Sequence, residues 1–317
     1  MSSENFFDFG SSIPSIHLSP MSGVTDLPFR LLALEAGADV TITEFTSAEA
    51  LSRDQPRSWE RVQTDAREKP FVAQIFGGKR ESMVTSAIKL QSTADIIDLN
   101  FGCPAPKVAK ACAGAALMGN PEKLVELTAA VIDAVSIPVT AKLRLGIDNN
   151  SKNIVQISRE LEKIGVMRLC IHGRTLKQRY SGDADWSAIS DVVSAVNIPV
   201  IANGDVVDGQ SAKRCLEKTG AQGLMIGRAA LGGPHILWWI KESLGWSGGV
   251  APWDKVNTSK DDLLRRAKLW GFNRYVELSR ELDLLRLKWL RRHAVDFTRG
   301  LPGGKLARMD IHGAGDD

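Results

Sequence analysis

The sequence predicts an α/β protein, a TIM (β/α)8 barrel followed by a small C-terminal helical domain. Eight short β-branched runs lie between residue 16 and about residue 240, and longer segments with apolar residues at helical spacing alternate with them. Eight such units in roughly 225 residues match the size and rhythm of a TIM barrel. After residue 245 the strand-like runs stop and only helical spacing continues. A doubly wound parallel sheet is the alternative that these observations leave open.

The eight runs have the length of buried strands in a parallel sheet. The segments between them, such as residues 121–135 and 151–164, are long enough for the crossover helices that parallel strands require. In residues 121–135 the apolar side chains fall on one helical face, as expected for a helix packed on a sheet. The predicted strands are residues 16–20, 39–44, 71–76, 95–100, 138–143, 168–172, 199–203 and 223–226.

The pattern changes at residues 245–254, which read Gly-Trp-Ser-Gly-Gly-Val-Ala-Pro-Trp-Asp and have the composition of a linker. We therefore expect a barrel domain over residues 1–244, a linker over 245–254 and a helical domain over 255–317. Apolar residues recur at helical intervals between 260 and 297, with charges between them, which predicts a small bundle. Residues 300–317 are rich in Gly and poor in apolar residues, so we expect an irregular end.

Composition excludes several classes of protein. Of the 317 residues, 44% are hydrophobic and 24% charged, which is unlike a disordered or fibrous chain. The first twenty residues carry Glu4 and Asp8 and lack an apolar segment, and no apolar run is long enough to span a bilayer. We expect a soluble, cytoplasmic protein without a membrane partner, and a monomer by default. The cysteines are too few for a disulfide framework and lack the C-x-x-C spacing of a zinc site, so we expect no metal: they are Cys103, Cys112, Cys170 and Cys215.

The net charge of +3 conceals an asymmetry along the chain. Residues 255–317 hold 14 Lys and Arg against 9 Asp and Glu, a net charge of +5. The preceding 254 residues hold 26 basic against 28 acidic side chains, a net charge of −2. A positive excess confined to the tail favours contact with a polyanion.

Polar residues stand at the ends of all eight predicted strands. In a barrel these ends converge on one mouth, where TIM-barrel enzymes place their active sites. Each segment alone has an ordinary explanation, since Asn-Gly-Asp is a common turn and Lys142 could extend along the surface, but their coincidence predicts a functional mouth. The segments are Pro20-Met21-Ser22-Gly23, Glu44, Gln74, Asn100-Phe101-Gly102-Cys103-Pro104, Lys142-Leu143-Arg144, His172-Gly173-Arg174-Thr175, Asn203-Gly204-Asp205 and Gly227-Arg228.

The ends of the seventh and eighth strands predict a phosphate site. Gly204 and Gly227 allow the backbone to approach a ligand closely, and Arg228 opens the next helix. Many barrel enzymes bind phosphorylated ligands in this way, so the other polar groups must distinguish among them.

Five segments resemble the signature sequences of the tRNA-dihydrouridine synthases. They are Leu-Ser-Pro-Met-Ser-Gly-Val-Thr-Asp-Leu-Pro-Phe-Arg (residues 18–30), Asp-Leu-Asn-Phe-Gly-Cys-Pro (98–104), Ala-Lys-Leu-Arg-Leu-Gly (141–146), Ile-His-Gly-Arg-Thr (171–175) and Ile-Ala-Asn-Gly-Asp (201–205). The resemblance extends to about residue 237 and resumes more weakly over residues 288–303. Ser19, Ala115 and Gly233 depart from the family pattern, which leaves the subfamily and the target uridine open.

The resemblance implies an FMN enzyme that takes hydride from NADPH and reduces the C5=C6 bond of a uridine in tRNA. Reduced flavin carries negative charge near its N1 and C2 carbonyl, and Lys142 is placed to supply the cation. By the same resemblance, Gln74 would bind the pyrimidine edge of the flavin. The remaining residues expected at FMN are Pro20, Met21 and Ser22 along the ring, His172 beside it, and Asn203, Gly204, Asp205, Gly227 and Arg228 at the ribityl phosphate.

Cys103 is the candidate proton donor. Saturating C5=C6 requires a hydride at C6 and a proton at C5, and a thiol with a pKa of about 8.5 is mostly protonated at neutral pH. A buried structural thiol is the alternative, and it is our interpretation of Cys170 and Cys215. The flanking Gly102 and Pro104 favour a functional loop instead. A redox pair between Cys103 and Cys112 is a further possibility that the spacing leaves open.

The substrate is expected to contact both the mouth and the tail. A uridine inside folded tRNA must be extracted into the barrel mouth while the surrounding backbone is held by a basic surface. A basic helix face can also be merely solvated, but the resemblance favours a tRNA-binding role for residues 255–317. We expect tRNA contacts from Asn100, Arg144, Arg174, Arg286, Lys288, Arg291 and Arg292.

Three other functions compete with this interpretation. A free-pyrimidine oxidoreductase of dihydroorotate dehydrogenase type also combines FMN, lysine and an acid or base, but it needs no basic tail. A non-catalytic tRNA-binding protein would not depend on Cys103. A flavin-free isomerase that binds phosphate would be colourless when purified.

Overall fold

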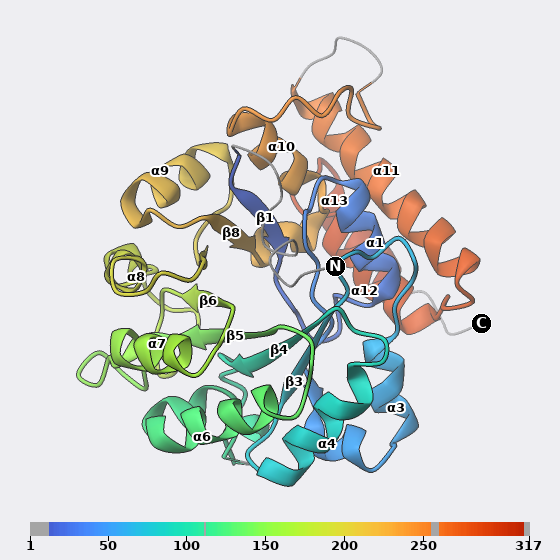
Figure 1. Ribbon diagram of the computed structural model, residues 1–317. Helices are drawn as coiled ribbons and strands as arrows, with labels where there is room; N and C mark the ends of the chain where they lie inside the picture. The colour runs from blue at the N-terminus through green and yellow to red at the C-terminus, as the bar shows by residue number, and fades with distance from the viewer. Residues whose placement is uncertain (1–12, 111, 255–259, 314–317) are drawn as a thin grey trace.

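The computed structural model describes residues 13–110, 112–254 and 260–313, which form a barrel of parallel strands with helices around it (Figure 1). The expectations for residues 1–12, for the start of the helical domain at 255–259 and for residues 314–317 lie outside these ranges. The strands are β1 (Ser15–Leu18), β2 (Thr46–Ser47), β3 (Val72–Phe76), β4 (Ile96–Phe101), β5 (Val139–Arg144), β6 (Arg168–His172), β7 (Val200–Asn203) and β8 (Gly223–Ile226).

The strand order confirms the barrel and excludes the doubly wound sheet. Neighbouring strands follow the order β1-β8-β7-β6-β5-β4-β3-β2, and every pair is parallel. A parallel bridge between His17 and Val40 joins β1 to the segment before β2 and closes the ring. Seven predicted strands lie within two residues of the observed ones.

The second predicted strand, residues 39–44, forms only isolated bridges, and the regular strand β2 comes later. Side chains replace part of the backbone ladder here. Asp39 Oδ2 accepts the N–H of Ile16 at 2.8 Å, and Thr43 Oγ1 accepts the N–H of Gln74 at 2.9 Å. Backbone bonds supply the rest, because the Leu18 N–H donates to the Val40 carbonyl at 2.9 Å and the Thr43 N–H donates to the Val72 carbonyl at 3.1 Å. The segment therefore pairs with both neighbours without forming a regular strand.

The helices begin and end at residues suited to those positions. Asp26 caps α1 by accepting the N–H of Phe29 at 3.1 Å, and Asp208 forms a capping box with Ser211 at the start of α9. The α-helices are α1 (Leu27–Glu35), α2 (Ala48–Ser52), α3 (Pro56–Trp59), α4 (Arg80–Leu90), α5 (Pro106–Lys110), α6 (Pro121–Ile132), α7 (Ile154–Lys163), α8 (Trp186–Val193), α9 (Gly209–Thr219), α10 (His235–Ser243), α11 (Lys260–Glu281), α12 (Leu287–Phe297) and α13 (Gly304–Gly313). Short 3₁₀ helices η2 (Glu60–Val62), η3 (Gly114–Gly119) and η4 (Arg228–Gly232) lie among them.

Successive side chains along each strand point alternately toward the surrounding helices and toward the interior of the barrel. Residues such as Ile97, Leu99 and Leu143 belong to the core between the strands and the surrounding helices. The alternate residues of the same strands, such as Asp98, Asn100 and Lys142, are also buried but belong to the polar interior of the barrel. The interior therefore carries polar side chains toward the C-terminal ends of the strands.

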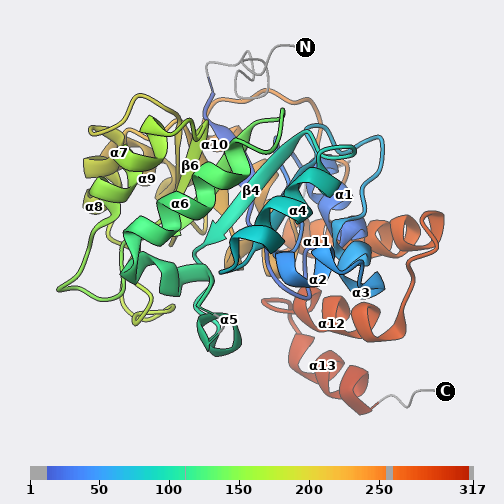
Figure 2. The same cartoon turned by 60° about the horizontal axis from the view of Figure 1, so that its bottom comes forward.

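The C-terminal helices pack directly on the barrel. Tyr275 and Leu278 of α11 belong to the same buried cluster as the barrel core, and Tyr275 Oη donates to Asp26 Oδ2 at 2.9 Å. Residues 245–254, expected as a linker, contribute Trp253, which is 4% exposed and packs against Trp238. Figure 2 shows α5, α12 and α13 at the end of the molecule toward which β4 points.

Helix α13 (Gly304–Gly313) corrects the expectation of an irregular end for these residues. Of its few large apolar side chains, Leu306 and Met309 remain exposed even though the backbone is helical. Among the described helices, none is long and apolar enough to cross a bilayer.

Candidate active site

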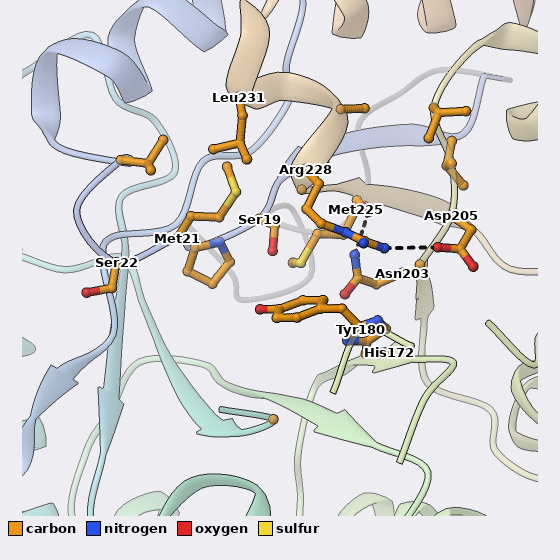
Figure 3. Close-up of a pocket in the computed structure, with 18 of the residues that line it drawn as sticks. Ser19, Met21, Ser22, His172, Tyr180, Asn203, Asp205, Met225, Arg228 and Leu231 are labelled. Atoms are coloured by element: carbon orange, nitrogen blue, oxygen red, sulfur yellow. Dashed lines mark hydrogen bonds and ion pairs between the residues drawn. The ribbon is translucent and has the colours of Figure 1, made fainter. Parts of the chain in front are cut away.

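A cavity of about 1040 Å³ opens at the C-terminal mouth of the barrel (Figure 3). Its walls come from strand ends on most sides, with further contributions from α10, α11 and α12. It brings together fourteen of the residues expected to donate the proton or to contact FMN or tRNA: Pro20, Met21, Ser22, Asn100, Cys103, Lys142, Arg144, His172, Asn203, Gly204, Asp205, Gly227, Arg228 and Arg292.

The Cys103 thiol lies in this wall and is nearly buried, with 7% of the residue exposed. Its loop follows β4 and packs against Val108 and Ala113. Burial raises the pKa of Cys103 above its usual value of 9.0, against the opposing effects of the Ala105 N–H, Arg144 and Lys142. The group is therefore a protonated thiol at neutral pH.

Asn100 and Arg144 hold the Cys103 loop in place. Asn100 Oδ1 accepts the N–H groups of Gly102 at 3.1 Å and Cys103 at 2.8 Å. Arg144 Nε donates to the Gly102 carbonyl at 2.8 Å, and its Nη1 donates to the carbonyls of residues 175 and 179 at 3.0 and 2.8 Å. Burial lowers the pKa of Arg144 to about 10, so it remains a cation at neutral pH.

Lys142 projects its ammonium into the cavity from β5. Nζ donates to Asn203 Oδ1 at 3.1 Å, and Asn203 Nδ2 donates in turn to the Met225 carbonyl at 2.8 Å. Burial lowers the pKa of Lys142, and the Arg144 charge acts in the same direction. Within the described ranges Asn203 is the one hydrogen-bond acceptor of this ammonium, which leaves donor capacity for a ligand.

His172 is 7% exposed, and burial lowers its pKa far below the ordinary value, with Lys142 and Arg144 adding to the effect. The ring is therefore neutral at physiological pH, with one nitrogen able to donate and the other able to accept.

Asp205 organises the side of the cavity beyond β7. It accepts two bonds from Arg174 Nη2, at 2.6 and 2.8 Å, and one from Arg228 Nη2 at 3.1 Å. Figure 3 shows Arg228 directed at Asp205. Gly204 has φ +121°, and a Cβ there would lie 2.8 Å from the Ala184 Cβ, so the position requires glycine.

Five of the residues expected to contact FMN or tRNA do not line the cavity. Gln74 is completely buried in the barrel interior, where its amide bonds to Asp98 and Asn100. The Arg174 guanidinium donates to Asp205. Three of the four tail residues also lie outside it: Arg286 and Lys288 are exposed around the start of α12, and Arg291 is half-buried.

The structure adds cavity residues that the sequence did not indicate. Tyr180 is 55% exposed and lies 5.1 Å from the Arg228 guanidinium and 5.7 Å from that of Arg144. Lys268 of α11 donates to the Gly232 carbonyl, and burial lowers its pKa to about 8. Neither residue lies at the end of a strand, so the pattern of polar strand ends could not predict them. For Tyr180, the one signal in the sequence is that the chain has just two tyrosines.

Comparison with known proteins identifies the family. The model of the family described as dihydrouridine synthase matches residues 17–247, which is most of the chain. This protein belongs to the dihydrouridine synthase family. A probable tRNA-dihydrouridine synthase of Rhodobacter capsulatus is 42% identical over 233 residues, which cover 73% of this chain and 72% of that protein. The tRNA-dihydrouridine synthase B of Pseudomonas putida is 36% identical over 293 residues, covering 92% and 84% of the two chains.

Nearly all residues that line the cavity of this dihydrouridine synthase fall within the matched residues 17–247. The exceptions are residues contributed by α11 and α12, such as Lys268 and Arg292, which follow the matched range. In the part of the chain that is described, no group of three His, Cys, Asp or Glu side chains is arranged to hold a metal ion.

Proposed function

We propose that this dihydrouridine synthase reduces the C5=C6 bond of uridines in tRNA, with bound FMN and NADPH as the reductant. The observation that carries the proposal is a protonated, nearly buried Cys103 thiol in the same cavity wall as the Lys142 ammonium. One group supplies a proton to carbon, and the other stabilises negative charge.

The residues of the cavity fit FMN. Lys142 retains unused donors and would face the N1 and C2 carbonyl edge, and the neutral His172 would lie beside the ring. Pro20 and Met21 offer apolar surface to a planar ring. The ribityl phosphate would lie at Asn203, Gly204, Asp205, Gly227 and Arg228, where Gly204 allows close backbone approach.

Gln74 would contribute differently from the other flavin residues. Its Oε1 and one N–H are already used by Asn100 and Asp98, so at most one N–H remains for the pyrimidine edge. Ser22 would lie along the ring, since it lines the cavity beside Met21.

When bound, FMN supplies the hydride that adds to C6 of the uracil. The chain's own task is to deliver a proton to C5. Cys103 holds this proton because burial favours the neutral thiol, and Asn100 and Arg144 fix the loop that aims it. These two residues therefore act on the substrate through Cys103 as well as from the cavity wall.

The tail would hold the RNA around the extracted uridine. Arg292 reaches the cavity, and Arg286, Lys288 and Arg291 extend a basic surface along α12. Phosphate contacts by such residues make binding strongly dependent on salt. Arg174 acts indirectly in this proposal, by fixing Asp205. We place the enzyme in the cytoplasm, where reducing conditions keep its thiols free, and expect a monomer.

An anaerobic experiment tests the proposal. The purified protein is reduced with NADPH, or with NADH for comparison, and flavin reoxidation is followed after addition of unmodified tRNA or of uracil and orotate. We expect reoxidation by tRNA alone, with dihydrouridine appearing in the RNA. Reoxidation by the free bases would assign the enzyme to pyrimidine metabolism instead, and a colourless protein that binds no FMN would refute the flavin assignment.

A further inference from the structure

A buried carboxylate, Asp98, lies beneath the active-site loop and has no place in the mechanism above. It is 2% exposed and does not line the cavity. Its Oδ1 accepts the Thr140 hydroxyl at 2.5 Å, and its Oδ2 accepts Gln74 Nε2 at 2.6 Å. Both oxygens are thus used by side chains of the neighbouring strands.

Strand register explains why these side chains meet. Asp98 on β4 pairs directly with Gln74 on β3 and with Thr140 on β5. Asn100 lies two residues after Asp98 and therefore points to the same interior face of the barrel. Asn100 is also next to the loop that carries Cys103, so a continuous row of polar groups connects the barrel interior with that loop.

Every hydrogen bond in this row is donated in the same sense, from the Cys103 loop toward Asp98. Gln74 Nε2 donates to Asp98, so Gln74 Oε1 faces Asn100 and accepts its Nδ2 at 2.7 Å. Asn100 Oδ1 is then free to accept the N–H groups of Gly102 and Cys103. If the Gln74 amide turned over, two NH2 groups would face each other, and Asn100 would have to turn its oxygen away from the loop.

We propose that Asp98 is a positioning residue that sets the orientation of the Gln74 and Asn100 amides and thereby holds the Cys103 loop. A carboxylate suits this role because it accepts on both oxygens and donates on neither. Burial raises the pKa of Asp98, whereas the hydrogen bonds from Gln74 and Thr140 and the charges of Arg168 and Lys142 act in the opposite direction and favour the carboxylate. The terminal torsion of an amide has two orientations that are nearly equal in shape, and only the hydrogen-bond partners distinguish them. Asp98 is the acceptor that removes this ambiguity. The expected effect of Asp98 on catalysis rests on the proposed role of Cys103, whereas its effect on the Cys103 loop does not.

Thiol alkylation tests the inference without requiring turnover. The exposed Cys112 is first replaced by serine, so that the remaining cysteines are all buried. Alkylation by iodoacetamide is then followed at Cys103 and, as an internal reference, at Cys215 of α9, which is 0% exposed. In Asp98→Leu, which removes the acceptor, we expect Cys103 to react about tenfold faster relative to Cys215, which corresponds to about 1.4 kcal/mol. General destabilisation would accelerate both thiols together.

Asp98→Asn is the matched control. Its amide oxygen can accept from Gln74 while its NH2 donates to the Thr140 hydroxyl, so we expect alkylation of Cys103 within about twofold of the parent. An unchanged ratio of Cys103 to Cys215 in Asp98→Leu would overturn the inference. If Asp98→Leu does not fold, Asp98→Ala gives the same comparison with a smaller change of shape.

Turnover separates this inference from the proposed function. We expect Asp98→Leu to lower kcat for tRNA reduction about tenfold with little change in KM, because Asp98 touches neither the cavity nor the RNA. Faster alkylation of Cys103 with an unchanged kcat would uphold the positioning role of Asp98 and count against Cys103 as the proton donor.

Discussion

Replacement of Glu68 by alanine should strongly destabilise the protein. Glu68 is 0% exposed and receives both Arg30 Nε at 2.6 Å and Arg30 Nη2 at 3.0 Å. Its oxygens also accept the hydroxyls of Thr41 at 2.7 Å and Thr64 at 3.1 Å. The substitution leaves the guanidinium of Arg30, which is 1% exposed, as an uncompensated buried charge. Loss of one partner of such a pair costs about 3–5 kcal/mol.

The expected effect on thermal stability follows from this figure. At about 2 °C for each kcal/mol in a chain of this size, Glu68→Ala should lower the Tm by about 6–10 °C in a thermal melt followed by circular dichroism. Glu49→Ala is the control, because Glu49 is 40% exposed in its ion pairs with Arg53 and Lys79, and solvent screening should leave the Tm nearly unchanged. Equal shifts for the two variants would refute the reasoning.

The same substitution should also weaken FMN binding. Arg30 Nη1 donates to the Thr25 carbonyl at 3.1 Å, and Thr25 Oγ1 accepts the N–H of Met21 at 3.0 Å. The pair with Glu68 therefore supports the cavity loop that carries Met21. We expect a higher flavin dissociation constant for Glu68→Ala, measured by fluorescence at a temperature well below its Tm, and no change for Glu49→Ala.

Three further predictions concern the proposed chemistry. Cys103→Ala should lower the rate of tRNA reduction by about 10²–10⁴-fold and leave flavin reduction by NADPH intact. Stopped-flow absorbance follows both steps. An active Cys103→Ala enzyme would exclude the thiol as proton donor. Because burial raises the pKa of Cys103 and the protonated form is the donor, the rate of tRNA reduction should hold as the pH rises and fall only above pH 9.0, and a decline centred well below that would contradict this assignment. Replacing Lys288, Arg291 and Arg292 together by glutamine should weaken tRNA binding. It should also reduce the slope of the logarithm of the binding constant against the logarithm of the salt concentration by about 0.7–0.9 for each lost phosphate contact. The same change at the exposed Lys213, Arg214 and Lys218 of α9 should leave the slope unaltered.

The barrel was predictable because both faces of its strands are buried. Residues such as Ile97 and Leu99 face the helices, while Ile96 faces the interior, so the runs are apolar almost throughout and stand out from the helical spacing. The second run, residues 39–44, bridges β1 and β3 as expected but forms no regular strand. The side chains of Asp39 and Thr43 accept part of the neighbouring N–H groups, and no strand propensity reports such bonds.

The site was predictable where it depends on strand direction and not where it depends on loops or later helices. Cys103 and Lys142 share a cavity because parallel strands end at the same mouth. Gln74 also ends a strand, but its amide is used by Asp98 and Asn100, and sequence alone does not show that occupancy. Tyr180 reaches the cavity from a loop, and Lys268 reaches it from helix α11, which follows the barrel in the sequence.

The packing of α11 on the barrel limits how the tail can be studied. Removal of residues after 254 would uncover the surface of α1 that Tyr275 and Leu278 cover, and would leave Glu35 without Arg274, which donates to it at 2.8 and 2.9 Å. A fragment of this kind would tend to aggregate through the exposed apolar surface. Its failure to bind RNA would therefore reveal little about RNA contacts, and substitutions of single surface charges are the better experiment.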